Sequence, residues 1–151
     1  MPFKSKLVLL ILTMLLLTSG LTTACQSQTA GHSEGHTYEL AGLEQMPYQV
    51  KQAPIAVQQA YQFAVANPDI LSQLPCYCGC GGMGHGSNYA CYVAGLNEDG
   101  TVQYDNHAIG CSICVDITLD TMRLLDEGQS TAEIKAYVDS TYARYGPSNM
   151  P

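Results

Sequence analysis

The chain opens with a basic segment followed by a long apolar run. Lys4 and Lys6 precede residues 7–17, which are apolar at nearly every position. This order is typical of an export signal. The run then passes through small residues to Cys25, as in bacterial lipoprotein signals. The pattern predicts a lipoprotein-type signal peptide over residues 1–24 and lipidation of Cys25, which would anchor the protein at the extracytoplasmic face of the bacterial cell membrane.

Two features depart from this pattern. The third position before the cysteine, commonly a branched aliphatic residue, is Thr22, and Leu21 stands one place early. Residues 7–24 also approach the roughly 18 residues that can span a bilayer, so an uncleaved anchor is the alternative. We favour the lipoprotein because setting Cys25 aside leaves an even number of cysteines, six, in the exported part.

Small and polar residues then dominate residues 25–45. Such a composition is typical of a flexible tether. We expect this tether to connect the membrane to one cysteine-rich domain over residues 46–147, since the chain is too short for two cores. His32 and His36 are four residues apart in the tether, and we interpret them as solvated rather than as metal ligands.

Apolar spacing predicts a helix and a shorter helical turn before the first cysteines of the domain. Pro54 suits the first turn of the helix. Asn67 is the expected N-cap of the shorter turn, and Pro75 ends it. The expected buried positions are Ile55, Val57, Ala60, Tyr61, Ala64, Val65, Ile70, Leu71 and Leu74.

The next pattern is that of a short β-hairpin. Residues 89–94 and 101–104 are rich in β-forming residues, and they flank a turn that contains Asp99 and Gly100. This arrangement predicts two paired strands, with Cys91 on the first.

Two further helices are predicted after the hairpin. One begins near Cys111 and runs to Glu127, with Gly128 as its stop. Ser130 and Glu133 match a capping box that begins the other. The fold class is therefore mainly α (α+β), with about three to four helices and one short β-hairpin around a cysteine-rich loop site. The expected inward positions are Ile113, Ile117, Leu124, Leu125, Ile134, Tyr137, Val138, Thr141, Tyr142 and Tyr145.

Composition narrows the class of function. The exported part, with ten tyrosines and no tryptophan, supports a modest core, which cross-links or a metal would strengthen. The net charge of −7 comes without a basic stripe to neutralise phosphates, so nucleic acid is not an expected partner. The chain has no nucleophile elbow, phosphate loop or suitably spaced carboxylate pair, and nothing in it indicates a hydrolase.

The candidate chemistry lies in the cysteines. Cys76, Cys78 and Cys80 occupy alternate positions, so in an extended backbone their side chains leave from one face. His107 stands four residues ahead of a Cys-x-x-Cys pair. The candidate metal ligands are Cys76, Cys78, Cys80, Cys91, Cys111, Cys114, His107 and His85.

Six thiols with two histidines suffice for two tetrahedral sites or one polynuclear cluster. Thiolate-rich sites select copper(I), zinc or iron–sulfur clusters, and air outside the cell disfavours the last. We favour copper slightly over zinc, because copper(I) tolerates low coordination and shared thiolates. For His107 a polar loop histidine is the alternative, and for His85, which lies between two glycines, a solvated loop residue is the favoured interpretation. A metalloprotein or redox partner would fit metal delivery or electron transfer.

Two other functions stay open. Three disulfides are the usual state of six exported cysteines, and would give an interaction module. Residues two apart rarely bond each other, so Cys76, Cys78 and Cys80 would each need a downstream partner. One disulfide beside one metal site is a mixed alternative. Cys111 and Cys114 at a helix start also suit a thiol–disulfide oxidoreductase, although the expected strand before such a helix is missing.

The residues Pro-Cys-Tyr-Cys-Gly-Cys at 75–80 carry a resemblance. The chain resembles the bacterial lipoproteins that are named for this motif and found chiefly in Bacillus-like organisms. The resemblance extends through Asp105-x-His107, Cys111-x-x-Cys114-x-Asp116 and the capped last helix. It implies export and the identity of the domain, and it leaves the activity to be argued from the residues.

Overall fold

The computed structural model describes residues 36–151, and this part of the chain is mainly helical, as predicted. It contains five α-helices, several 3-10 turns and one two-stranded hairpin. Two of the helices, α2 (Tyr48–Lys51) and α4 (Pro68–Leu71), are single turns. None of the helices in residues 36–151 is long and apolar enough to cross a membrane. The predicted signal peptide, Cys25 and His32 lie outside the described residues.

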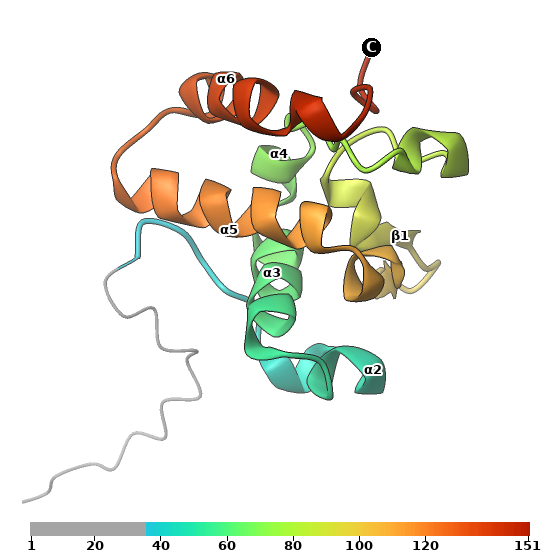
Figure 1. Cartoon of the computed structure of the whole chain (residues 1–151). Coiled ribbons are helices and arrows are strands. Elements are labelled where there is room, and N and C mark those ends of the chain that lie inside the picture. Colours follow the sequence, from blue (N-terminus) through green and yellow to red (C-terminus); the bar gives the residue numbers. More distant parts are fainter. Residues whose placement is uncertain (1–35) are drawn as a thin grey trace, which may run out of the picture. The chain divides into compact units, whose positions relative to one another are not determined.

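Three longer helices form the body of the domain. They are α3 (Ile55–Ala66), α5 (Ser112–Asp126) and α6 (Thr131–Tyr142). α5 packs against α3 on one side and against α6 on the other (Figure 1). The core between them is fully buried and includes Tyr61, Phe63, Ile117, Ile134 and Val138.

The boundaries of α5 and α6 agree with the sequence signals. Glu127 is the C-cap of α5, and Gly128 follows with a φ of 81°, the left-handed conformation that glycine adopts readily. The capping box of α6 is present in full. The Ser130 oxygen accepts from the Glu133 backbone N–H, and the Ser130 N–H donates to the Glu133 carboxylate. α5 therefore ends at its glycine stop signal, and α6 begins at its capping box, as the sequence predicted.

Two expectations around α3 are wrong. Ile55 is 72% exposed rather than buried. Asn67 makes no side-chain cap for α4. Its Nδ2 instead donates to the carbonyl oxygens of Phe63 and Glu39, both at 2.8 Å. The last carbonyls of a helix lack partners within the helix, so Asn67 satisfies the end of α3 rather than the start of α4.

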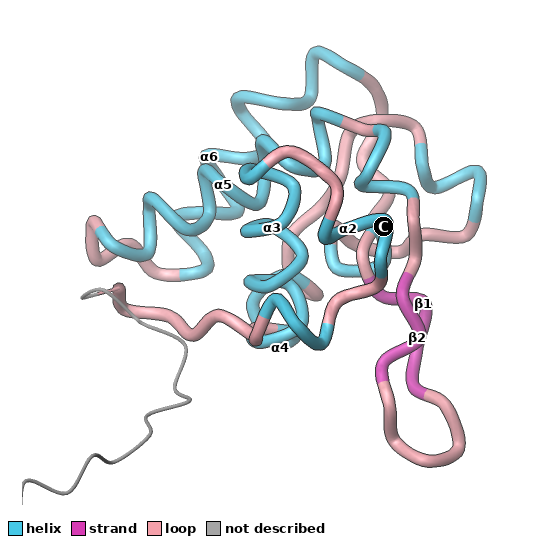
Figure 2. Tube along the Cα trace, turned by 90° about the horizontal axis from the view of Figure 1, so that it is seen from below, coloured by secondary structure: helices cyan, strands magenta, loops and turns pink. Residues whose placement is uncertain are grey.

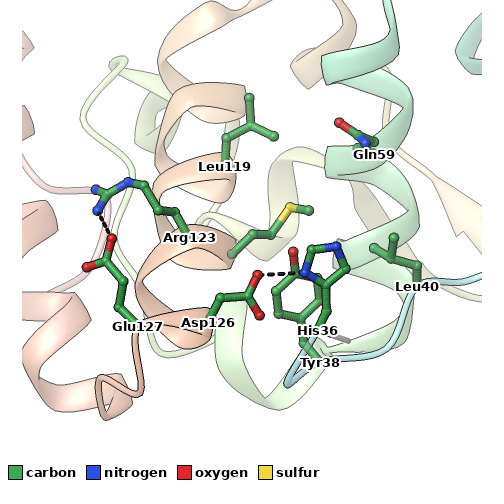
Figure 3. Close-up of a pocket in the computed structure, with 9 residues that line it drawn as sticks. His36, Tyr38, Leu40, Gln59, Leu119, Arg123, Asp126 and Glu127 are labelled. Carbon is green, nitrogen blue, oxygen red and sulfur yellow. Dashed lines mark hydrogen bonds and ion pairs between the residues drawn. The ribbon is translucent and has the colours of Figure 1, made fainter. Parts of the chain in front are cut away.

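The segment 36–45 packs against the domain, although composition indicated a tether as far as residue 45. Tyr38 is buried with its ring edge-to-face against Phe63, and Ala41 exchanges hydrogen bonds with Gln62. His36 Nδ1 lies 2.6 Å from an Asp126 carboxylate oxygen in a pocket beside α5 (Figure 3). His36 is therefore exposed but held against α5 rather than free in a linker, and the packed domain begins by residue 36.

The hairpin is shorter than predicted and begins after Cys91. β1 (Val93–Leu96) pairs antiparallel with β2 (Val102–Tyr104), with an irregularity between Val93 and Gly95. The strands project from the helices (Figure 2). Cys91 lies on the 3-10 turn Tyr89–Cys91 instead of on a strand, because its N–H bonds locally to the Asn88 carbonyl.

The last residues also belong to the domain, which extends past the predicted end at residue 147. The Asn149 N–H donates to the Cys76 carbonyl oxygen at 3.1 Å, and the Asn149 side-chain oxygen accepts from the Cys76 N–H at 2.6 Å. These two bonds hold the C-terminus beside the cysteine loop, and the C-terminal end of the chain lies at that side of the molecule in Figure 1.

Candidate metal site

The structure brings together all eight residues that the sequence singled out within the domain. Within each of four overlapping groups, all ligand atoms lie within 4.8 Å of one another. The groups are Cys78, His107, Cys111 and Cys114; Cys80, His85, Cys91 and His107; Cys76, Cys78 and Cys80; and Cys76, Cys91 and Cys114. Because the groups share members, the donors form one continuous cluster, which can hold a metal ion.

The separations match those of ligands around one ion. The Cys76 sulfur is 3.4 Å from those of Cys78 and Cys114, and the latter two are 3.6 Å apart. Sulfurs about 2.3 Å from a tetrahedral zinc ion are themselves about 3.8 Å apart, and a sulfur and an imidazole nitrogen are about 3.6 Å apart. Cys78 Sγ lies 3.4 Å from His107 Nε2. The donor atoms are thus separated by about the distances expected between ligands of a single ion.

The loop that carries Cys76, Cys78 and Cys80 reaches this arrangement by turning. Gly79 and Gly84 have φ angles of 85° and 90°, which side chains rarely adopt. The 3-10 turn Cys80–Met83 lies between them. The predicted convergence of the three sulfurs is present, but a wrapped loop produces it rather than a continuous extended segment.

The start of α5 supplies the opposite wall of the cluster. Cys111 is the N-cap, and Cys114 lies in the first turn, where it is fully buried. The Cys114 carbonyl oxygen accepts hydrogen bonds from the Tyr92 hydroxyl at 2.8 Å and from the Asn88 amide at 3.3 Å. Thr118 joins both residues, with its hydroxyl 2.8 Å from Asn88 Oδ1 and 2.7 Å from the Tyr92 hydroxyl. This buried polar network fixes the first turn of α5 beneath the sulfurs.

His85 is the largest correction within the site. The favoured interpretation of a solvated loop residue is wrong, because its side chain is only 12% exposed and faces the cluster. Its Nε2 lies 3.3 Å from an Asp105 carboxylate oxygen, whereas its Nδ1 is buried without a hydrogen-bond partner in the described residues. A histidine with one ring nitrogen held by a carboxylate and the other free is arranged as metal-ligating histidines are.

Asp105 positions both histidines. Besides its contact with His85, it accepts a hydrogen bond from the His107 backbone N–H at 2.7 Å. Its own carbonyl oxygen accepts from the buried Tyr61 hydroxyl at 2.7 Å, which fixes the residue to α3. Asp105 belongs to the Asp105-x-His107 motif, but no role for it was predicted from the sequence. The short spacing Asp105-x-His107 is the signal that pointed to it.

Asn149 was missed entirely, because it lies beyond the predicted end of the domain. Besides its two bonds to the Cys76 backbone, its amide nitrogen donates to Cys80 Sγ at 3.5 Å and to the His85 carbonyl at 3.0 Å. One side chain therefore contacts three segments of the cysteine loop. No pattern near residue 149 signals this contact, since its partners are 64–73 residues away.

The electrostatics of the thiols favour a bound cation. Hydrogen bonds from Cys114 and Cys91 lower the pKa of the Cys76 thiol. Burial raises the pKa of Cys78 and of Cys80, because it disfavours the thiolate. Burial thus works against deprotonation of these two thiols, and a cation bound nearby would favour their thiolate forms.

The geometry also concerns the two alternative functions, a disulfide-stabilised module and a thiol–disulfide oxidoreductase. All six cysteines in the described residues are free, and their nearest sulfurs are 3.4 Å apart, compared with about 2.05 Å in a disulfide. The element before Cys111 is the 3-10 turn His107–Gly110, not the strand that a thioredoxin-like enzyme requires. Moreover, the Cys114 sulfur contacts Cys76 and Cys78, so the Cys-x-x-Cys is not an isolated redox pair.

The fold and the site together define a small helical domain built around a cysteine–histidine cluster. Residues 8–151 match the family described as "protein of unknown function with PCYCGC motif". The chain belongs to this family, which confirms the family that the motif indicated, whereas the bacterial lipoprotein origin stays a prediction. No curated protein and no solved structure matched the chain.

Proposed function

We propose that the protein binds soft metal ions at this cluster, with copper(I) slightly favoured over zinc, for metal binding, delivery or electron transfer. The buried Nδ1 of His85, which has no hydrogen-bond partner within residues 36–151, carries the proposal. A buried polar atom without a partner costs free energy, and a metal ion among the neighbouring sulfurs would supply the missing interaction. The donor set of thiolates and imidazoles is the one that soft ions prefer.

The sharing of ligands supports copper. Both four-residue groups include His107, and Cys76 belongs to neither. Two separate zinc sites with four ligands each would therefore compete for one imidazole. Cys76 instead belongs to two groups of three sulfurs. Copper(I) accepts three sulfurs and bridging thiolates, and several monovalent ions would offset the charge of a six-thiolate cluster.

The cellular setting belongs to the same proposal. A lipid on Cys25 would hold the domain at the extracytoplasmic face of the bacterial cell membrane, where a metalloprotein or redox protein could exchange metal or electrons with it. Replacing Cys25 with serine should block lipid-dependent maturation and shift the product out of the detergent phase on partitioning. Unchanged processing and partitioning would remove the anchor from the proposal.

Metal analysis of the full chain tests the central claim. Protein purified anaerobically in mild detergent should retain one or more soft ions per chain, and copper should displace zinc in competition. Cys78→Ser should lower the metal content. Ser140→Ala, a control substitution outside the cluster, should not. A metal-free chain with three disulfides would overturn the proposal and leave a disulfide-stabilised module.

A further inference from the structure

We infer that the cluster has two unequal halves and that metal enters and leaves through one of them. The inner set, Cys80, His85 and Cys91, would retain its ion. The outer set, Cys78, Cys111 and Cys114, would exchange its ion through an open pocket beside Cys111. His107 is common to both halves, and Cys76 groups with members of each. This inference rests on the proposed function and adds the route by which the ion moves.

Burial distinguishes the halves. Cys80 and Cys91 are 1% and 0% exposed. In the outer set, Cys78 and Cys111 are only half-buried, and Cys114 alone is fully enclosed. An ion on the inner set therefore has no solvent-facing thiolate that a competing ligand could replace first, whereas an ion on the outer set has two.

The inner set also receives more hydrogen bonds from residues outside the cluster than the outer set does. In the inner set, Asp105 holds His85, and the Asn149 amide donates to the Cys80 sulfur. In the outer set, the Cys78 sulfur contacts only other members of the cluster, and the Cys111 sulfur has no hydrogen bond within residues 36–151. A ligand that is not held in place can leave an ion with little reorganisation, so Cys111 is the ligand best suited to detach.

The pocket gives this ligand access to solvent. It has a volume of about 380 Å³ and is bordered by α3, by the turn before α5 and by the first turns of α5. Its lining residues are Ala56, Val57, Ala108, Ile109, Gly110, Cys111, Ser112, Val115 and Asp116. The walls are mostly apolar, and the Asp116 carboxylate is exposed. This composition offers a cation one acidic group at the entrance and one thiol on the wall.

Exchange would proceed by ligand substitution without redox change. A thiolate or nitrogen donor of the acceptor binds the ion as the bond between the ion and Cys111 Sγ breaks. The released Cys111 thiolate takes a proton from water, and the remaining bonds to Cys78 and Cys114 break in turn. The ion keeps its oxidation state throughout. The acceptor is thus a soluble chelator or a protein that presents a soft donor to the pocket.

Release kinetics test the inference. The full chain, loaded anaerobically with copper(I) in mild detergent, is mixed with excess bathocuproine disulfonate. Release should occur in two phases whose rates differ at least about tenfold, which corresponds to ~1.4 kcal/mol in activation free energy. Cys111→Ser should remove the fast phase and keep the slow one. Cys91→Ser should remove the slow phase. Single-phase release would overturn the inference, as would loss of the same phase in both variants.

Blocking the pocket separates access from ligation. Ala56→Phe and Ser112→Phe place a ring at the pocket without replacing a ligand. Either variant should slow the fast phase while the copper content stays constant. Ala132→Phe, on the exposed first turn of α6, is the matched control and should leave both phases unchanged. Full copper content with unaltered kinetics in both pocket variants would refute the route and leave the metal site intact. A chain that binds neither copper nor zinc would instead refute the proposed function.

Discussion

At the scale of single residues, the cluster depends on side chains that are not themselves ligands. Asn149 contacts the loop at the Cys76 backbone, the Cys80 sulfur and the His85 carbonyl. Asp105 aligns His85 and holds the backbone of His107. Such outer contacts orient ligands and typically contribute a factor of about 10–100 to metal affinity. They are positioning residues, and each can be tested without removing a donor.

Asn149→Ala should weaken copper(I) binding by a factor of about 10–100, because the loop loses its connection to the C-terminus. Asn149→Asp keeps an oxygen that can accept from the Cys76 N–H but loses the amide that donates to Cys80. Asn149→Asp should therefore lower the copper(I) affinity at least as much as Asn149→Ala does, since it also adds a negative charge beside a thiolate. Competition with a colorimetric chelator measures both affinities. Equal affinities in the wild type and both variants would contradict this role.

Asp105→Asn should also reduce copper(I) affinity, by about 10–100-fold, because an amide holds an imidazole less strongly than a carboxylate does. The loss should shrink markedly when His85 is already alanine, since the two residues would then have no interaction left to lose. Affinity measurements on the two single variants and the double variant complete the cycle. Additive losses would show that Asp105 acts on the site independently of His85.

At the scale of elements, helix ends and turns place the donors. The N-terminus of α5 carries Cys111 and Cys114, and packing between α5 and α6 holds that helix. α6 itself begins at the Ser130–Glu133 capping box. Because short helices depend on both packing and caps, the cap contributes to the stability of the wall on which the cluster stands. Tyr77 adds a second link, since its hydroxyl donates to Asp139 of α6 at 2.7 Å.

Ser130→Ala should lower the free energy of unfolding by about 0.5–2 kcal/mol, because the Glu133 backbone N–H loses its acceptor and the Glu133 carboxylate loses the Ser130 hydroxyl. Ser140→Ala, on the same helix, is the control and should change it less. Denaturant titration at fixed metal content measures both. If the two alanine variants are equally stable, the cap contributes nothing measurable.

The same capping box predicts a dependence on pH. Hydrogen bonds from the Ser130 side chain and backbone lower the pKa of Glu133 below its ordinary value of 4.5. A carboxyl group whose pKa is lower in the folded state stabilises that state above the unfolded pKa and loses the effect as pH falls through the folded pKa. The stability difference between wild type and Glu133→Gln should therefore diminish below about pH 4.5. A difference that stays constant into more acidic solution would contradict this account.

At the scale of the whole molecule, the cluster joins distant parts of the chain. The loop from Pro75, the turn that carries Cys91, the segment from Asp105 to Cys114 and the C-terminus all meet there. A small domain with a modest core gains from such a cross-link. Metal binding and folding should consequently be coupled, because a metal that binds only the folded chain stabilises it.

Removal of the metal under reducing conditions should lower the melting temperature by about 10 °C or more, corresponding to ~2 kcal/mol or more in a domain of this size. Up to six thiols should become reactive in the folded domain, and hydrogen exchange should increase first in residues 76–91. Re-addition of copper(I) should restore both properties. An unchanged melting temperature after complete removal would show that the cluster does not act as a cross-link.

The sequence by itself determined the features that neighbouring residues encode. Pro75, the alternating cysteines and the Ser130–Glu133 box act over a few residues, so the helices, the hairpin and the candidate ligands could be predicted from them. Tertiary structure alone decided how His36, His85 and Asn149 are used. Their partners lie far along the chain, 90 residues away for His36 and 64–73 for Asn149. Contacts at such separations depend on how the whole core packs, and no local pattern records them.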